Sequence, residues 1–310
     1  MRELLIVCGP TASGKTAVAV EICREIGGEV VSADSMQIYR GMDIGTAKPT
    51  EEEKRGVPHH LLDIIDPGET YSVAAYREKA VEAIEDIFAR GKIPVVCGGT
   101  GLYIDALTRP MGFSAQGDES IRRRLEEIAE QGGGRDRLHD MLREVDPESA
   151  DRLHVNDVRR VVRALEVHQL TGRTLTEQRS LDRAREGAYR GRHYGLSWPR
   201  EALYHRIDRR VLEMVQAGLT NEVEALLKGG LGAGATAMQG IGYKEIARAL
   251  TGECALDEAV SRIQQATRNY AKRQLTWFRR DERVKWIEAA GRSARDISRE
   301  ILKCETEERS

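Results

Sequence analysis

A glycine-rich segment directly after a short apolar run is the feature that most restricts the fold of this chain. The run Leu4–Cys8 is continuously apolar, which is typical of a strand buried on both faces. The next eight residues are Gly9, Pro10, Thr11, Ala12, Ser13, Gly14, Lys15 and Thr16. They match the pattern G-x-x-x-x-G-K-[ST], and Lys15–Ile26 then has helical apolar spacing. A strand, this loop and a helix in that order predict a phosphate-binding turn.

The chemistry of this loop needs each of its parts. Glycines allow backbone N–H groups to turn inward around phosphate oxygens, and the helix N-terminus adds positive partial charge. Lys15 adds a full charge, and the Thr16 hydroxyl can hold Mg²⁺. The alternative is a glycine turn that binds no ligand.

The first hundred residues alternate strands and helices. Strands are predicted at 30–34 and Ile93–Cys97, with a helix over Ser72–Ala89 between them. This alternation predicts a parallel sheet with right-handed crossovers. The fold class is therefore α/β, with a P-loop-type parallel sheet as its core.

Residues from about 118 to 190 show helical patterns and no convincing strand. We interpret 113–198 as a helical insertion, with 1–112 and 199–310 forming the α/β core. Asp118, Asp146 and Asn156 are predicted helix caps within the insertion, and Asp257 is predicted to cap the last long helix. A final strand is expected at Val284–Ile287. The end of the chain, 305–310, is expected to be frayed.

Composition and charge exclude several classes of protein. Apolar residues make up 40% of the chain and charged residues 32%, enough to form a core. No apolar run approaches the roughly 18 residues that a membrane helix needs, and no signal peptide is recognisable. Five cysteines form no CxxC pair, so a reducing cytosol is expected. The net charge is −2, but 159–198 and 257–280 are locally basic.

The position of the acidic residues helps to distinguish ATP from other diphosphate compounds as the ligand of the loop. The strand Ile93–Cys97 is followed by glycines and Thr100, and carries no acid of the kind that orients water or Mg²⁺ in an ATPase. The acid is Asp34, after the second strand. A diphosphate compound other than ATP is therefore a candidate ligand. A metal-binding acid elsewhere in the chain remains the alternative.

Asp34 lies at the sheet edge where open α/β sheets bind their ligands. It can act as a general base, as a metal partner, or as the cap of the following segment. The Gln37 amide nearby can both donate to and accept from a base edge.

Two helices carry clustered basic residues. Arg159, Arg160 and Arg163 suit phosphate contacts, or form a solvated face. The last long helix forms either a nucleic-acid surface or a core helix with a basic outer face. Its residues of interest are Arg268, Lys272 and Arg279, with Tyr270, Trp277 and Phe278 between them.

Several long motifs together resemble one family, the tRNA dimethylallyltransferases, also called tRNA isopentenyl transferases. They are GPTASGKT, SADSMQIYRGMDIGTAKP, HHLLD, VVCGGTGLY, NDVRRVVRALEV, YHRIDRRVLEMVQAGL, QGIGYKE and NYAKRQLTWFRRD. These motifs are spread over nearly the whole chain. Eukaryotic members often carry a C-terminal zinc finger, and no such pattern occurs in these 310 residues, so we expect a member of the bacterial type.

The resemblance implies transfer of a dimethylallyl group from dimethylallyl diphosphate to the exocyclic N6 amine of an adenine, with release of diphosphate. That adenine lies just 3′ of the anticodon in tRNAs reading codons that begin with U. Asp34, Thr100 and Arg206 would be catalytic, the loop Gly9–Thr16 would bind the diphosphate, and Mg²⁺ at Thr16 would assist. The implied tRNA contacts are Asp34, Ser35, Met36, Gln37, Thr100, Arg122, Arg159, Arg160, Val161, Val162 and Arg163.

The insertion would bind the anticodon stem-loop, and we expect a monomeric cytoplasmic enzyme without membrane association. Two alternatives remain open. One is an enzyme that prenylates free adenine nucleotides, which would not need the basic helix of the insertion. The other is a P-loop kinase or a nucleotide-switched nucleic-acid binder, which should bind or hydrolyse ATP.

Overall fold

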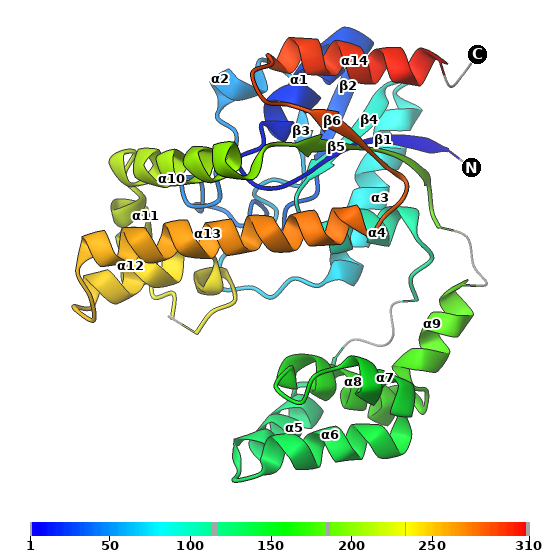
Figure 1. Ribbon diagram of the computed structural model, residues 1–310, viewed down its shortest axis with the longest axis vertical. Helices are drawn as coiled ribbons and strands as arrows, with labels where there is room; N and C mark the ends of the chain where they lie inside the picture. The colour runs from blue at the N-terminus through cyan, green and yellow to red at the C-terminus, as the bar shows by residue number, and fades with distance from the viewer. Residues whose placement is uncertain (1, 113–116, 184–186, 233, 308–310) are drawn as a thin grey trace. The chain divides into compact units, whose positions relative to one another are not determined.

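The computed structural model describes residues 2–112, 117–183, 187–232 and 234–307. The chain divides into two compact units, one made of Met1–Thr108 with Tyr189–Ser310 and the other of Arg109–Ala188 (Figure 1). The first unit carries the sheet, and the second is helical in its described residues. The insertion therefore ends ten residues before the expected boundary at 198, because Arg190–Ser197 pairs along the first strand of the sheet.

Six strands form one sheet in the described part of the chain, and every neighbouring pair is parallel. In spatial order they are β3 (His59–His60), β2 (Gly28–Ser32), β4 (Ile93–Gly98), β1 (Glu3–Cys8), β5 (Arg190–Ser197) and β6 (Val284–Glu288). The predicted α/β class with a parallel sheet is confirmed. Because β2, β4 and β1 are neighbours, the loops that follow them meet at one edge of the sheet.

Helices cover both faces of this sheet. The described helices of this unit are α1 (Lys15–Ile26), α2 (Glu51–Lys54), α3 (Val73–Ala89), α4 (Gly101–Thr108), α10 (Arg200–Gln216), α11 (Leu219–Lys228), α12 (Tyr243–Leu250), α13 (Leu256–Arg279) and α14 (Ala294–Glu307). Helices α1 and α14 pack on one face through Ile22, Ile297 and Ile301, and α3 and α4 lie on the other (Figure 1).

Helices α10 to α13 form a second apolar core beside the sheet. Val211, Leu219 and Ile263 pack there against Ile38 and Met42, which follow β2. The predicted helix around 203–214 is confirmed as α10, but α11 is separated from it at Gly218, whose φ of 102° is left-handed. A short 3₁₀ turn, Ala237–Gln239, precedes α12.

Two predictions about the C-terminal part were wrong. Helix α13 begins at Leu256 after Ala255, so Asp257 lies in its first turn and caps nothing with its side chain. The supposed frayed end includes α14 up to Glu307, because Glu305 is buried and accepts a hydrogen bond from the Tyr194 hydroxyl at 2.7 Å. Residues 308–310 lie outside the described part.

The helical unit contains α5 (Glu119–Glu130), α6 (Gly134–Val145), α7 (Pro147–Arg152), α8 (Val158–Thr171) and α9 (Leu175–Arg183). Its core includes Leu125, Leu142 and Leu165. The caps predicted at Asp118 and Asp146 are confirmed, since each carboxylate accepts backbone N–H groups of the following turn. The Asn156 cap was wrong by one residue: α8 follows Asp157, which makes no side-chain cap.

The chain leaves and rejoins the sheet unit at neighbouring points. The Tyr189 N–H donates to the Leu107 carbonyl at 3.1 Å, and the Arg190 N–H donates to the Arg2 carbonyl at 3.0 Å. Among the described helices, none combines the length and apolarity required to span a membrane.

Candidate active site

The predicted phosphate loop connects β1 to α1, as its sequence indicates. Ala12 and Gly14 have left-handed φ values of 61° and 88°, which turn the backbone sharply. No side chain of the described residues caps the N-terminus of α1. Its first N–H groups are therefore available to an anion, together with the positive end of the helix dipole.

Behind the loop, two side chains hold its carbonyls. Arg206 Nε donates to the Ala12 carbonyl at 2.8 Å, and Trp198 Nε1 donates to the Ser13 carbonyl at 3.0 Å. The Arg206 guanidinium also stacks over the Trp198 ring. Arg206, expected beside the diphosphate, thus contacts the phosphate loop itself, and it is not among the residues that line the cavity described next. Its contact with the diphosphate stays a prediction.

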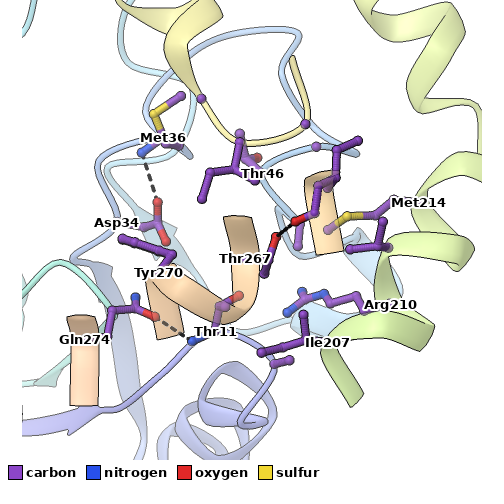
Figure 2. Close-up of a pocket in the computed structure, with 18 of the residues that line it drawn as sticks. Thr11, Asp34, Met36, Thr46, Ile207, Arg210, Met214, Thr267, Tyr270 and Gln274 are labelled. Carbon is purple, nitrogen blue, oxygen red and sulfur yellow. Dashed lines mark hydrogen bonds between the residues drawn. The ribbon is translucent and has the colours of Figure 1, made fainter. Parts of the chain in front are cut away.

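A cavity of about 290 Å³ opens in front of the loop. Its lining includes the polar residues Thr11, Lys15, Asp34 and Arg210 and the apolar residues Ile207, Val211, Met214, Leu219 and Ile263. Figure 2 shows several of both kinds, among them Asp34, Arg210 and Met214. A smaller polar recess beside it includes Thr16 and Cys97. Such a combination suits a ligand with an anionic head and a short hydrocarbon group.

Arg210 is a site residue that the sequence interpretation missed. It lines both cavities, and it makes no hydrogen bond or ion pair with any group that the structure describes. Burial lowers the pKa of Arg210 and that of Lys15, yet an arginine stays charged in proteins. The sequence does contain one sign of this role: Arg210 follows Arg206 by four residues on α10, so the two arginines lie one turn apart on the same side of the helix.

Asp34 lies two residues beyond β2 and lines both cavities with Lys15 and Arg210. One of its carboxylate oxygens accepts the Met36 N–H at 2.9 Å, so the carboxylate also closes a local turn (Figure 2). No helix follows directly, since α2 begins at Glu51. Asp34 therefore caps a local turn and not a helix. Its other carboxylate oxygen remains available for other partners.

Thr100 supports the same segment from β4. Its hydroxyl accepts the Ser35 N–H at 3.1 Å, and its N–H donates to the Ala33 carbonyl at 3.0 Å. Tyr270 of α13 lines the cavity, and burial together with the charge of Asp34 raises the pKa of Tyr270 to about 12. Asp34, Ser35, Met36 and Thr100 are thus brought together at the sheet edge.

Gln37, the expected contact with a base, lines the smaller recess and also holds a neighbouring loop. Its Nε2 donates to the carbonyls of Thr46 and Ala47, at 3.2 and 3.0 Å. The amide donors are therefore engaged in holding the loop at 46–47, which lines the cavity.

Gln274 is a second residue that the sequence interpretation missed. Its Oε1 accepts the Thr11 N–H at 2.8 Å, and its Nε2 donates to the Gly99 carbonyl at 3.0 Å (Figure 2 shows the first bond). Helix α13 therefore contributes to the core with its inner face, while Trp277 is 41% exposed. The interpretation as a core helix is confirmed for this inner face, and the nucleic-acid surface stays a prediction.

The predicted tRNA-binding residues of the insertion differ in exposure. Val161 and Val162 are 1% and 2% exposed and belong to the core, so their side chains are unavailable to RNA. Arg122 and Arg163 both pair with Glu166, which is fully buried, at 3.1 and 2.7 Å.

The two remaining arginines of this helix lie on its outer side. Arg160 pairs with Asp157 at 3.2 Å. Arg159 is exposed and makes no hydrogen bond or ion pair among the described residues, so it is the member of the cluster best able to take a phosphate.

A parallel sheet with a phosphate loop, and a cavity lined by a carboxylate and three cationic side chains (Lys15, Arg210 and Arg273), are typical of an α/β enzyme of the group-transfer class. Two family models match the chain: IPP transferase over residues 37–281 and isopentenyl transferase over residues 2–67. The chain therefore belongs to the tRNA dimethylallyltransferase family, whose members are prenyltransferases.

The relatives support this over almost the full length. A tRNA dimethylallyltransferase of Geobacter metallireducens is 53% identical over 290 residues, covering 94% of each chain. The solved tRNA isopentenylpyrophosphate transferase of Bacillus halodurans is 41% identical, with a TM-score of 0.73 and coverage of 99% and 96%. A eukaryotic dimethylallyltransferase captured acting on tRNA is 29% identical, with a TM-score of 0.81 and coverage of 94% and 75%.

Proposed function

We propose that this protein transfers a dimethylallyl group from dimethylallyl diphosphate to the exocyclic N6 of the adenine 3′ of the anticodon, in tRNAs that read codons beginning with U. The observation that carries the proposal is one cavity lined by Asp34, Lys15 and Arg210, beside apolar side chains. This arrangement supplies a base, an anion site and room for a short hydrocarbon.

The chemistry follows from these positions. The adenine amine attacks C1 of the donor, a C–N bond forms and the C–O bond to the diphosphate breaks. The amine proton goes to the Asp34 carboxylate. The negative charge that develops on the departing oxygens is stabilised by Lys15, Arg210 and the N–H groups of the phosphate loop.

Mg²⁺ fits the donor set of the polar recess. Thr16 offers a hydroxyl and Asp34 a carboxylate there, and Mg²⁺ commonly binds one or two protein oxygens together with phosphate oxygens and water. We assign Thr16 as the protein ligand of the metal, which would supply further charge for the leaving diphosphate. The described residues contain no cluster of three or more His, Cys, Asp or Glu side chains able to hold a metal alone.

Recognition of tRNA is divided between the units. In the sheet unit, Ser35, Met36 and Thr100 surround Asp34 and would hold the flipped adenine. In the helical unit, Arg159 and its neighbours would bind phosphates of the anticodon stem-loop. The cysteines of the chain are free thiols, which supports action in a reducing cytoplasm. We propose that the enzyme works as a monomer, which light scattering of the purified protein would check.

One assay separates the three candidate activities. The protein is incubated with Mg²⁺ and labelled dimethylallyl diphosphate, with unmodified tRNA or free adenosine monophosphate, and with or without ATP. Label in tRNA alone, independent of ATP, is expected. Label in the free nucleotide would favour the nucleotide-prenylating alternative, and ATP hydrolysis coupled to RNA modification would favour a kinase or ATPase.

A further inference from the structure

Glu222 of α11 binds a backbone segment more than 170 residues away in the sequence. Its carboxylate accepts three consecutive N–H groups: those of Asp43 and Ile44 at 2.9 and 2.8 Å, and that of Gly45 at 3.1 Å. Successive N–H groups that converge in this way form an anion-binding nest. Here the anion is a side chain of the protein itself.

Tyr243 of α12 fixes the same carboxylate from the other side. Its hydroxyl donates to Glu222 at 2.6 Å, and the residue is 1% exposed. Burial, with the nearby charge of Glu222, raises the pKa of Tyr243 far above its ordinary range, so the hydroxyl remains a donor. The ring also fills the space beside Gly45, where an added Cβ would lie 2.5 Å from it.

The far end of this segment is held by Gln37. Its amide donates to the carbonyls of Thr46 and Ala47, and Ala47 has a left-handed φ of 52°. Alanine disfavours this conformation, so it persists only where the surroundings enforce it. Loop 43–47 is therefore restrained at its N–H groups by Glu222 and at its carbonyls by Gln37.

The restrained loop forms a wall of the active-site cavity. Gly45, Thr46 and Ala47 line that cavity together with Lys15 and Asp34. Thr46 and Ala47 also line the smaller recess that contains Thr16. A shift of this loop would change the space available to the donor without touching any of the proposed catalytic groups.

We propose that Glu222, anchored by Tyr243, is a positioning residue for prenyl transfer: it sets the place of loop 43–47 and so the shape of the prenyl-donor site. The identity of the substrate in this inference rests on the proposed function. The claim that Glu222 holds loop 43–47 against the cavity does not depend on it. A small displacement of a cavity wall can cost much of the rate of a reaction between oriented partners.

The test compares Glu222→Gln and Tyr243→Phe with Glu224→Gln. Glu224 lies two residues away on α11, is half-exposed, and pairs with Lys228 at 2.8 Å, so it is a matched control. In Glu222→Gln the amide keeps one acceptor oxygen and replaces the other with a donor that faces N–H groups. Tyr243→Phe removes only the hydroxyl and serves if Glu222→Gln fails to fold.

Three readouts are needed. Hydrogen exchange of the amides of 43–45 should quicken at least about tenfold in both variants, because their acceptor is removed or released. The KM for dimethylallyl diphosphate should rise about tenfold or more in Glu222→Gln and less in Tyr243→Phe, with the KM for tRNA within about twofold. Binding of inorganic diphosphate with Mg²⁺ should weaken in parallel, and Glu224→Gln should match wild type in all three.

Two results would overturn the proposal. Unchanged exchange at 43–45 would show that the carboxylate does not hold the loop. Faster exchange with unchanged donor KM and diphosphate affinity would show that the loop does not shape the site, leaving Glu222 a purely structural role. If wild-type protein transfers no prenyl group, the proposed function fails, while exchange and diphosphate binding still decide the positioning role.

Discussion

Arg206 lies 4.3 Å from the centroid of the Trp198 ring, and both side chains donate hydrogen bonds to carbonyls of the phosphate loop. Because the carbonyls of Ala12 and Ser13 are bound from outside, the N–H groups of the turn are left to face the ligand. This pair of donors therefore fixes the orientation of the loop.

Removal of one of these donors should weaken binding of the prenyl donor. Trp198→Phe keeps an aromatic ring and removes the bond to Ser13, worth about 1 kcal/mol, so the KM for dimethylallyl diphosphate should rise about fivefold. Arg200→Lys is the control, since Arg200 stacks on Tyr204 of the same helix without bonding to the loop. Steady-state kinetics at saturating tRNA provide the measurement, and an unchanged KM would contradict this role.

Asp34→Asn should remove the proposed base and keep the shape of the side chain. The remaining carbonyl oxygen can still accept the Met36 N–H, so tRNA affinity should change little. We expect the single-turnover rate at saturating donor to fall about 10²–10⁴-fold. A rate within a few-fold of wild type would exclude Asp34 as the base.

Arg210→Ala should impair the diphosphate site. Arg210 faces the cavity without a partner among the described residues, and a charge-assisted bond is worth about 1.5–3 kcal/mol. Affinity for inorganic diphosphate with Mg²⁺, measured by calorimetry, should thus drop about 10–150-fold. The neighbouring Arg209→Ala, whose side chain pairs with Glu213 at 3.4 Å, should bind like wild type. Equal behaviour of the two variants would argue against Arg210 as an anion ligand.

Arg159→Ala tests the RNA-binding role of the helical unit. If Arg159 binds a phosphate, its removal should make the plot of log binding constant against log salt concentration shallower by somewhat under one unit. Arg143→Ala is the control, because Arg143 is exposed in the same unit and pairs with Asp140. Arg163→Ala is less suitable, since it would leave the buried Glu166 with fewer partners. Weaker binding with an unchanged slope would indicate an effect on folding.

Glu29 should make stability depend on pH. Its carboxylate is 1% exposed and binds Arg90, Lys92 and His60, and the hydrogen bond from Arg90 holds the pKa of Glu29 far below its usual range. A carboxyl group whose pKa is lower in the folded than in the unfolded protein stabilises the fold fully at pH values above its unfolded-state pKa. This stabilisation is lost as the pH falls from there toward the folded-state pKa. Wild type should therefore lose stability below about pH 4.5.

The variant Glu29→Gln should reduce this dependence of stability on pH. Glu29→Gln should unfold about 1.5–3 kcal/mol more easily at pH 7, because the partly exposed Arg90, Lys92 and His60 lose a charged hydrogen-bond partner. It should also lose part of the acid sensitivity. Denaturant unfolding at pH 7 and pH 3.5 measures both, with the exposed Glu25→Gln as control. Parallel pH profiles for Glu29→Gln and wild type would contradict the prediction.

The phosphate loop, the central strands and α1 could be predicted because each depends on local pattern: a buried strand, a glycine turn and four-residue apolar spacing. Residues 193–198 have strand character in the sequence, yet the boundary at 198 placed them in the insertion, and the polar residues Arg190 and Arg192 gave no apolar run to mark the start of β5. In the structure Arg192 pairs with Glu3 at 2.8 Å and His193 is buried, so tertiary partners offset the polarity.

The residues missed at the site depend on contacts that are distant in the sequence. Gln274 and Glu222 bind loops far from them along the chain, and Arg210 lines a cavity that such loops help to form. These relationships follow from how α10, α11 and α13 pack beside the sheet. A periodic pattern predicts that a helix has a buried side, but it does not say which loop lies opposite a given polar side chain. Only the packed structure gives those pairs.

The bond between the Tyr189 N–H and the Leu107 carbonyl places the exit and return of the chain one hydrogen bond apart. The eighty residues between 109 and 188 thus form a side branch whose two ends already meet, much as the two strands of a hairpin meet below its turn. A turn of a few residues could close the sheet unit in its place without rethreading any strand. The same junction would accept a branch of another length, so insertions or deletions within 109–188 need not disturb the strands of the sheet.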